Sequence, residues 1–239
     1  MKKLSALSII FMLLIGLCGC NQFQDTPETD AAFAAYEAAV RQTIAQKAGE
    51  ITVVTKNQDT VVEKTESLGV IEYSFSVDDQ NRVSFERNDF TNDEMVASYY
   101  GDGKAAYQMD LSTDQWIDVT NVSGDMLDHE KNIFSTLSLF RIDHNFRYSK
   151  RFYESVAMEE AEGEKIITVV IKNSELDQMF SMTDEKGIRR EMASQTRKYY
   201  IDDQGMISKI MIDTAQNITY KGNSGILTNL ITVTLDYEV

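Results

Sequence analysis

The stretch IEYSFSVDDQNRVSFERNDF, residues 71–90, holds two runs of alternating apolar and polar residues joined by a polar turn. In the first run Ile71, Tyr73, Phe75 and Val77 alternate with Glu72, Ser74 and Ser76. A period of two places successive side chains on opposite faces of a β-strand, so this strand is expected to bury one face and expose the other. Residues 78–81 suit a turn, and residues 82–90 a second strand. The stretch predicts an antiparallel hairpin.

Similar runs recur along most of the chain, so strands are predicted to dominate the fold. They are predicted at Ile51–Lys56, Thr60–Glu66, Arg82–Phe90, Met95–Tyr100, Lys104–Leu111, Phe146–Met158, Lys165–Lys172, Glu191–Ile201, Met206–Thr214 and Ile226–Val239. Turn signals at 101–103, 202–205 and 222–225 favour a meander. We therefore expect neighbours in sequence to pair in space.

Three segments show helical spacing instead. From Thr29 the apolar residues recur three and four apart, and Gly49 is a plausible residue just past the helix end. Residues 128–141 and 174–186 predict two short amphipathic helices, the second opening on a capping-box-like Ser174 and stopping at Gly187. Their apolar faces consist of Ile133, Phe134, Leu137 and Phe140 in the first, and Leu176, Met179 and Phe180 in the second.

Together these elements predict an α+β fold. We expect a strongly curved antiparallel sheet, an unclosed β-barrel, with the N-terminal helix and the two short helices, acting as lids, on its concave side. Two hairpins resemble those of extracellular lipoproteins of the LolA-like family, and the match covers roughly Thr29 to Val239. They are Tyr99-Tyr100-Gly101-Asp102-Gly103-Lys104 with Tyr107 and Trp116, and Tyr199-Tyr200-Ile201-Asp202 leading into Gly205 and Ile210.

The resemblance implies a concave face, covered by the lid helices, that holds acyl chains. Such a pocket must be apolar, because a hydrocarbon chain would leave polar wall groups without hydrogen bonds. The abundant methionines, such as Met109 and Met211, either line such a pocket or fill an ordinary core. The seven apolar residues of the two lid faces are our candidate ligand contacts. A soluble shuttle role does not fit an amino terminus that predicts a lipid anchor.

The amino terminus predicts a lipid anchor. Lys2 and Lys3 precede an apolar run from Leu4 to Leu17, and Leu17-Cys18-Gly19-Cys20 resembles the lipobox of lipoprotein signal peptides. Cleavage would remove residues 1–19 and leave Cys20 to carry lipid such as palmitate, with residues 20–28 as a tether and 29–239 as one domain. We therefore expect attachment to the extracytoplasmic face of a cell membrane. The alternatives are an ordinary secretory signal or a buried amino-terminal helix.

Charge and cysteine content exclude several function classes. Loss of residues 1–19 would leave 21 bases against 38 acids, a formal net charge of −17. A field of that sign repels phosphate backbones, so we expect no nucleic-acid partner. Cys18 would leave with the signal and Cys20 would carry the lipid, so neither a disulfide nor a reactive thiol is expected in the folded domain.

No pattern predicts catalysis. A Gly-x-Ser-x-Gly elbow is missing, and the nearest string, residues 222–225, is typical of a turn. His129 and His144 lack the tight local spacing of zinc ligands, so exposed histidines beside acids are expected there. The aspartates at 78–79 and 202–203 do not follow the calcium-loop pattern. We expect a non-enzymatic protein without catalytic residues, metal or cofactor.

Two functions remain open at this point. The first is a membrane-anchored protein that binds a lipid or other amphipathic ligand in an apolar cavity. The second is an interaction module with a filled core whose acidic surface contacts envelope proteins or cell-wall polymers.

Overall fold

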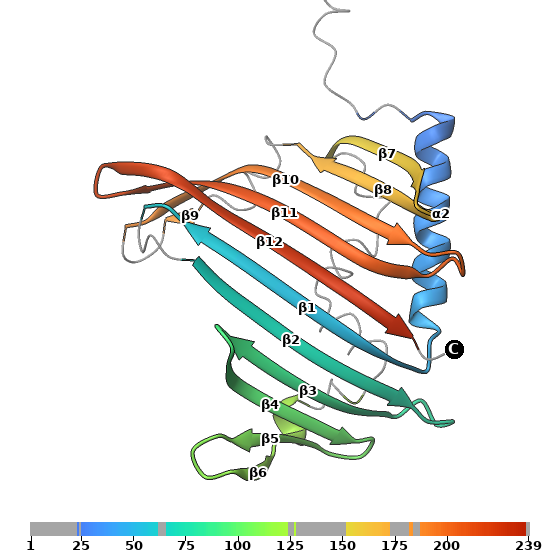
Figure 1. The fold of residues 1–239 in the computed structure, drawn as a ribbon, viewed down its shortest axis with the longest axis vertical. Helices are drawn as coiled ribbons and strands as arrows, with labels where there is room; N and C mark the ends of the chain where they lie inside the picture. Colours follow the sequence, from blue (N-terminus) through green and yellow to red (C-terminus); the bar gives the residue numbers. More distant parts are fainter. Residues whose placement is uncertain are drawn as a thin grey trace, which may run out of the picture.

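The computed structural model describes residues 23, 25–61, 66–123, 127, 152–172, 182–183 and 187–237. They form one antiparallel sheet with an N-terminal helix at its side (Figure 1). The elements are α2 (Pro27–Ile44), β1 (Ala48–Asp59), β2 (Glu66–Val77), β3 (Val83–Thr91), β4 (Glu94–Asp102), β5 (Ala106–Asp110), β6 (Gln115–Asp118), α3 (Thr120–Ser123), β7 (Tyr153–Ala161), β8 (Glu164–Ile171), β9 (Met182–Thr183), β10 (Arg189–Ile201), β11 (Ile207–Tyr220) and β12 (Asn223–Tyr237).

The sheet is open. Its strand order is β6-β5-β4-β3-β2-β1-β12-β11-β10-β8-β7, with the short β9 paired to β10 beside this path. Most strands pair with their neighbours in sequence, and β12 returns to pair with β1. Because β6 and β7 are the two ends of the path, the barrel does not close. The predicted class, an unclosed antiparallel sheet with an N-terminal helix, is confirmed.

Helix α2 begins with a capping box. The Thr26 side chain accepts a hydrogen bond from the Thr29 backbone N–H at 3.2 Å, and the Thr29 side chain accepts one from the Thr26 N–H at 2.9 Å. These bonds satisfy two donors that a helix start leaves open. Near the other end, buried Thr43 accepts a hydrogen bond from the Ile207 backbone N–H at 2.9 Å, which fixes the helix to β11.

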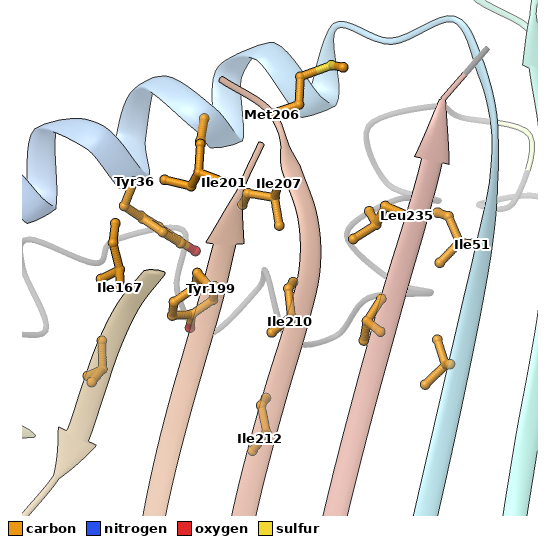
Figure 2. Close-up of a cluster of buried hydrophobic side chains, with 14 of the residues drawn as sticks. Tyr36, Ile51, Ile167, Tyr199, Ile201, Met206, Ile207, Ile210, Ile212 and Leu235 are labelled. Atoms are coloured by element: carbon orange, nitrogen blue, oxygen red, sulfur yellow. The ribbon is translucent and has the colours of Figure 1, made fainter. Parts of the chain in front are cut away.

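One face of the sheet, which we call the inner face, packs against α2. Tyr36 of the helix and Tyr199 of β10 meet edge to face with ring centroids 4.8 Å apart. Figure 2 shows these rings among isoleucines from β8, β10 and β11. The cluster also includes Ile51 and Leu235, so it reaches β1 and β12. The opposite face is the outer face. Among the described residues no helix is long and apolar enough to cross a membrane.

The end of the predicted first helix is wrong. The helix stops at Ile44 and the chain enters β1 at Ala48, so Gly49 lies in a strand and not after a helix. A Cβ at Gly49 would lie 2.6 Å from the Asp236 carbonyl oxygen of β12. The glycine therefore allows two strands to approach closely. In the sequence alone, a glycine with this role looks the same as one that ends a helix.

The predicted strand Thr60–Glu66 is also wrong at its start. Strand β1 continues to Asp59, and residues 60 and 61 form a bend. The Asp59 carboxylate accepts a hydrogen bond from the Val61 N–H at 2.7 Å, and the Thr60 hydroxyl donates to the Ile226 carbonyl at 2.9 Å. Side chains that bond to nearby backbone in this way compete with strand pairing.

The hairpin turns are built largely by aspartates. The Asp78 carboxylate accepts hydrogen bonds from the N–H groups of residues 80 and 82, and Asp102 and Asp202 cap their turns in the same way. At the β11–β12 connection Lys221 and Gly222 both have positive φ, which is typical of a two-residue hairpin. The acids at 78 and 202 are turn residues, in agreement with the sequence analysis.

Candidate ligand-binding face

The residues predicted for lipidation and ligand contact lie outside the described residues. They are Cys20, Ile133, Phe134, Leu137, Phe140, Leu176, Met179 and Phe180. Within the second predicted helix only residues 182 and 183 are described, and these form strand β9 against β10, so the helix prediction is wrong at that end. The candidate site is therefore built from the inner face of the sheet.

Strand register arranges the inner-face side chains in rows that cross the sheet. One row passes through Tyr199, Ile210, Val233, Val53 and Ile71 on β10, β11, β12, β1 and β2. The first four of these side chains are buried. A wall of branched aliphatic and aromatic groups offers dispersion contacts and no hydrogen bonds, which suits a hydrocarbon ligand or a plain core.

A second row lies four residues along the strands from the first, at the end of the sheet away from α2. It passes through Gln195, Thr214, Asn229, Asn57 and Ser67, again on β10, β11, β12, β1 and β2. We call these five residues the polar row. Because strands rise about 3.3 Å per residue, the polar row lies roughly 13 Å from the apolar row.

Hydrogen bonds join most neighbours within the polar row. The Gln195 amide donates to the Thr214 hydroxyl at 3.3 Å. The Asn229 amide donates to the Asn57 oxygen at 2.5 Å, and the Asn57 amide donates to the Ser67 hydroxyl at 3.4 Å. Each row member carries an amide or a hydroxyl, so the row can exchange hydrogen bonds with a polar group without a change of charge.

Arg197 lies between the apolar row and the polar row. Its side chain is only 6% exposed, and its Nε and Nη2 atoms donate to the Gln195 oxygen at 3.0 and 2.7 Å. A buried guanidinium needs such acceptors because burial of a charge is otherwise costly. Nearby on β11, the side-chain oxygen of Gln216 is buried and accepts no hydrogen bond within the described part of the chain.

The polar row and Arg197 were not predicted from the sequence. A signal exists: Asn57 occupies an inward position in the alternation that begins with Ile51 and Val53, and Asn229 does the same before Val233 and Leu235. An amide at an inward position is unusual in a sheet whose inner face is apolar. Recognition of the row, however, requires the register of five strands, and sequence alone does not fix that register.

Within the described part of the chain, the groups with shifted pKa values lie away from the polar row. Hydrogen bonds from the Arg82 backbone lower the pKa of Asp78, and those from the Ala105 backbone lower that of Asp102, both in hairpin turns. Burial raises the pKa of Tyr237, whose hydroxyl donates to the Ile207 carbonyl at 3.4 Å. Among the described residues no three histidine, cysteine or acidic side chains gather to hold a metal ion. The described inner face therefore combines apolar side chains, neutral amides and hydroxyls, and the buried guanidinium of Arg197.

Solved structures with a similar course of the chain include three bacterial proteins. LprF from Mycobacterium bovis aligns over 87% of this chain and 92% of its own, with 11% identity and a TM-score of 0.44. A LolA superfamily protein from Nitrosomonas europaea covers 87% and 94%, with 8% identity and a TM-score of 0.29. A putative outer membrane lipoprotein-sorting protein domain from Vibrio parahaemolyticus covers 87% and 94%, with 7% identity and a TM-score of 0.28.

These likenesses concern the fold alone. One of the three is described as a LolA superfamily protein. No protein-family model matches the sequence, and no curated protein matches it either.

Proposed function

We propose that this protein is a non-enzymatic lipoprotein, anchored by Cys20 to the extracytoplasmic face of a membrane, that binds a lipid or other amphipathic ligand on its inner face. The observation that carries the proposal is the change along the strands from an apolar row to the polar row. An acyl chain fits the first because it needs no hydrogen bonds, and a polar head fits the second. The ligand would lie along the strands, with its head near Asn57 and Asn229.

The two predicted helices would cover this ligand. Leu127 and Phe152, the described residues on either side of segment 128–151, both pack against the core cluster. The strands next to them, β6 and β7, are opposite edges of the sheet. The described residues at the two ends of this segment thus lie next to opposite edges of the sheet, each against the core. This supports lid contacts by Ile133, Phe134, Leu137 and Phe140, with the segment of Leu176, Met179 and Phe180 as a second lid.

The anchor is tested by metabolic labelling with palmitate. The full chain should take up label and sediment with membranes, and the Cys20→Ser variant should do neither. Within the predicted tether, residues 26–28 cap and begin helix α2 and Phe23 packs against the core cluster, so protease should leave these residues attached to the folded domain. Label retained by the Cys20→Ser variant would contradict the anchor and leave the ligand proposal untouched.

Ligand binding is tested on protein purified from membranes in a mild detergent. Native mass spectrometry should find a co-purifying adduct of lipid mass, and solvent extraction would identify its class. A fluorescent fatty acid should also bind, and replacement of Asn229 by leucine should weaken uptake of lipids with a large polar head more than uptake of the fatty acid. A protein free of adduct that takes up no acyl probe would contradict the proposal and favour the interaction module with a filled core.

A further inference from the structure

A hollow of about 610 Å³ lies on the outer face of the sheet, over strands β1 to β4. Its size falls within the range of small-molecule sites, roughly 300–1,000 Å³. The residues that line it with side chains on the outer face are Ala48, Glu50, Ser74, Ser76, Ser84, Glu86, Tyr100 and Trp116. This surface is separate from the inner face on which the proposed function depends.

Alternation along the strands assigns these side chains to the outer face. A Cβ at Gly49 would lie 3.4 Å from the Phe75 ring, and one at Gly101 would meet the Phe85 ring, so both rings are on the inner face. The residues before and after each ring therefore point outward. Figure 1 shows β1 to β4 as one continuous run of strands with the β5–β6 hairpin at its edge.

Register places the lining residues in two parallel rows. Glu50, Ser74, Glu86 and Tyr100 are aligned on β1, β2, β3 and β4, and Ala48, Ser76 and Ser84 form the next row. The side chains of the second row are small, so they form a floor that lies deeper than the surrounding surface. Since neighbouring strands lie about 4.8 Å apart, the hollow is roughly 14 Å long, enough for more than one sugar ring.

An aromatic wall closes one end of the hollow. Tyr100 stacks on Tyr107 with centroids 4.6 Å apart, and Trp116 meets the Tyr100 ring edge to face at 4.6 Å. Trp116 nevertheless remains 41% exposed. The neighbouring rings thus fix the orientation of an indole that still offers open surface. A rigid exposed indole binds apolar C–H faces at little entropic cost.

The floor and sides of the hollow present free polar groups. The hydroxyls of Ser74, Ser76 and Ser84 are exposed and make no hydrogen bond within the described part of the chain, and Glu50 is likewise exposed. Hydroxyls both donate and accept, and carboxylates accept two hydrogen bonds from neighbouring hydroxyls. Among the described residues that line the hollow, none is basic.

From this combination we propose that the outer hollow binds a neutral glycan chain. The C–H face of one sugar would stack on Trp116, and the hydroxyls of the next would bond to Glu86, Glu50 and the serine floor. Polyanions are disfavoured because both charged residues of the lining are acids. A hydrocarbon is disfavoured because the floor is hydroxylated. A basic peptide would pair with the glutamates but would not use the serines.

The test titrates the full chain in detergent with uncharged pentasaccharides, one of β-1,4-linked N-acetylglucosamine and one of α-1,4-linked glucose, and with pentalysine. Trp116 is the single tryptophan of the chain, so its emission reports directly on the hollow. We expect a saturable change with at least one pentasaccharide that persists at high salt. Calorimetry on the same samples gives the affinity without dependence on the reporter.

Three variants sharpen the test. Trp116→Ala should lower the sugar affinity at least about tenfold, and Ser76→Gln, which fills the floor and keeps the reporter, should do the same. Glu159→Gln on the exposed strand β7, at the opposite edge of the sheet, is the matched control and should change nothing. Thermal unfolding of each variant separates loss of the site from loss of the fold, and Ser76→Gln decides if Trp116→Ala does not fold.

Three results would overturn the proposal. One is the absence of binding by either sugar. Another is binding of pentalysine alone that disappears at high salt, which would assign the hollow to a basic protein partner. The last is sugar binding that neither Trp116→Ala nor Ser76→Gln weakens in folded protein. None of these results bears on lipid uptake by the inner face.

Discussion

At the scale of single residues, two glutamines on the inner face have opposite surroundings. The Gln195 oxygen accepts two hydrogen bonds from the buried Arg197, whereas the Gln216 oxygen is buried without a donor among the described residues. We predict that Gln195→Leu lowers the free energy of unfolding by about 2 kcal/mol or more, because it removes acceptors from a buried charge. Gln216→Leu should leave stability unchanged or raise it by up to about 1 kcal/mol.

Urea unfolding of the two variants and the wild type measures this difference directly. The substitution is chemically the same at both positions, so each variant is the control of the other. Equal destabilisation by both would show that Arg197 does not depend on Gln195.

Tyr237 predicts how stability responds to alkaline pH. Burial raises the pKa of its hydroxyl above the ordinary value of 10.0, so the folded state favours the neutral form. The resulting stabilisation is fully present below pH 10 and is lost as pH rises from there towards the folded-state pKa. Tyr237→Phe should therefore lose less stability than the wild type between neutral pH and pH above 10.

Urea unfolding at a series of pH values across pH 10 tests this prediction. The difference in unfolding free energy between the two proteins should be constant below that pH and shrink above it. Parallel pH profiles would mean that the Tyr237 hydroxyl ionises equally in the folded and unfolded chain.

At the scale of elements, the stability of helix α2 depends on the capping box that Thr26 forms with Thr29. We predict that Thr26→Ala lowers the free energy of unfolding by about 1 kcal/mol, because the capping box with Thr29 is lost. Thr26→Ser keeps a hydroxyl at the cap and should retain most of this stability. Chemical denaturation with helical circular dichroism as the signal measures both. Identical stability of Thr26→Ala and wild type would show that the cap contributes nothing.

The elements also show where sequence patterns suffice. The alternation of residues 71–77 and the Asp-rich turn after it predict the turn of the β2–β3 hairpin and the strand ends beside it to within a residue, whereas β2 begins at Glu66, five residues before the alternation. Gly49 and Thr60 were misassigned because their roles depend on distant strands: Gly49 on the Asp236 carbonyl and Thr60 on Ile226. Local patterns do not contain such contacts. The polar row escaped prediction for the same reason, since Asn57 and Asn229 become neighbours only through register.

At the scale of the whole molecule, the proposed lids cover the ligand while the apolar row belongs to the core. A substitution in a lid should therefore lower ligand uptake without lowering the stability of the fold. We predict that Phe134→Asp lowers uptake of a fluorescent fatty acid at least about tenfold. A lid residue contacts ligand more than core, so the melting temperature should change by only about 2 °C. The physical reason is that an aspartate beside an acyl chain must either lose its hydration or open the lid.

The matched control is Val122→Asp. Val122 lies in α3 and is 88% exposed, so the same change of charge there touches neither the inner face nor a lid, and both uptake and melting temperature should stay as in the wild type. Fluorescence titration and thermal unfolding on the same samples of the three proteins give the two quantities. A Phe134→Asp variant that loses uptake and stability in equal measure would place Phe134 in the ordinary core. One that retains full uptake would remove segment 128–141 from the ligand site and leave the inner face to be covered by another part of the chain.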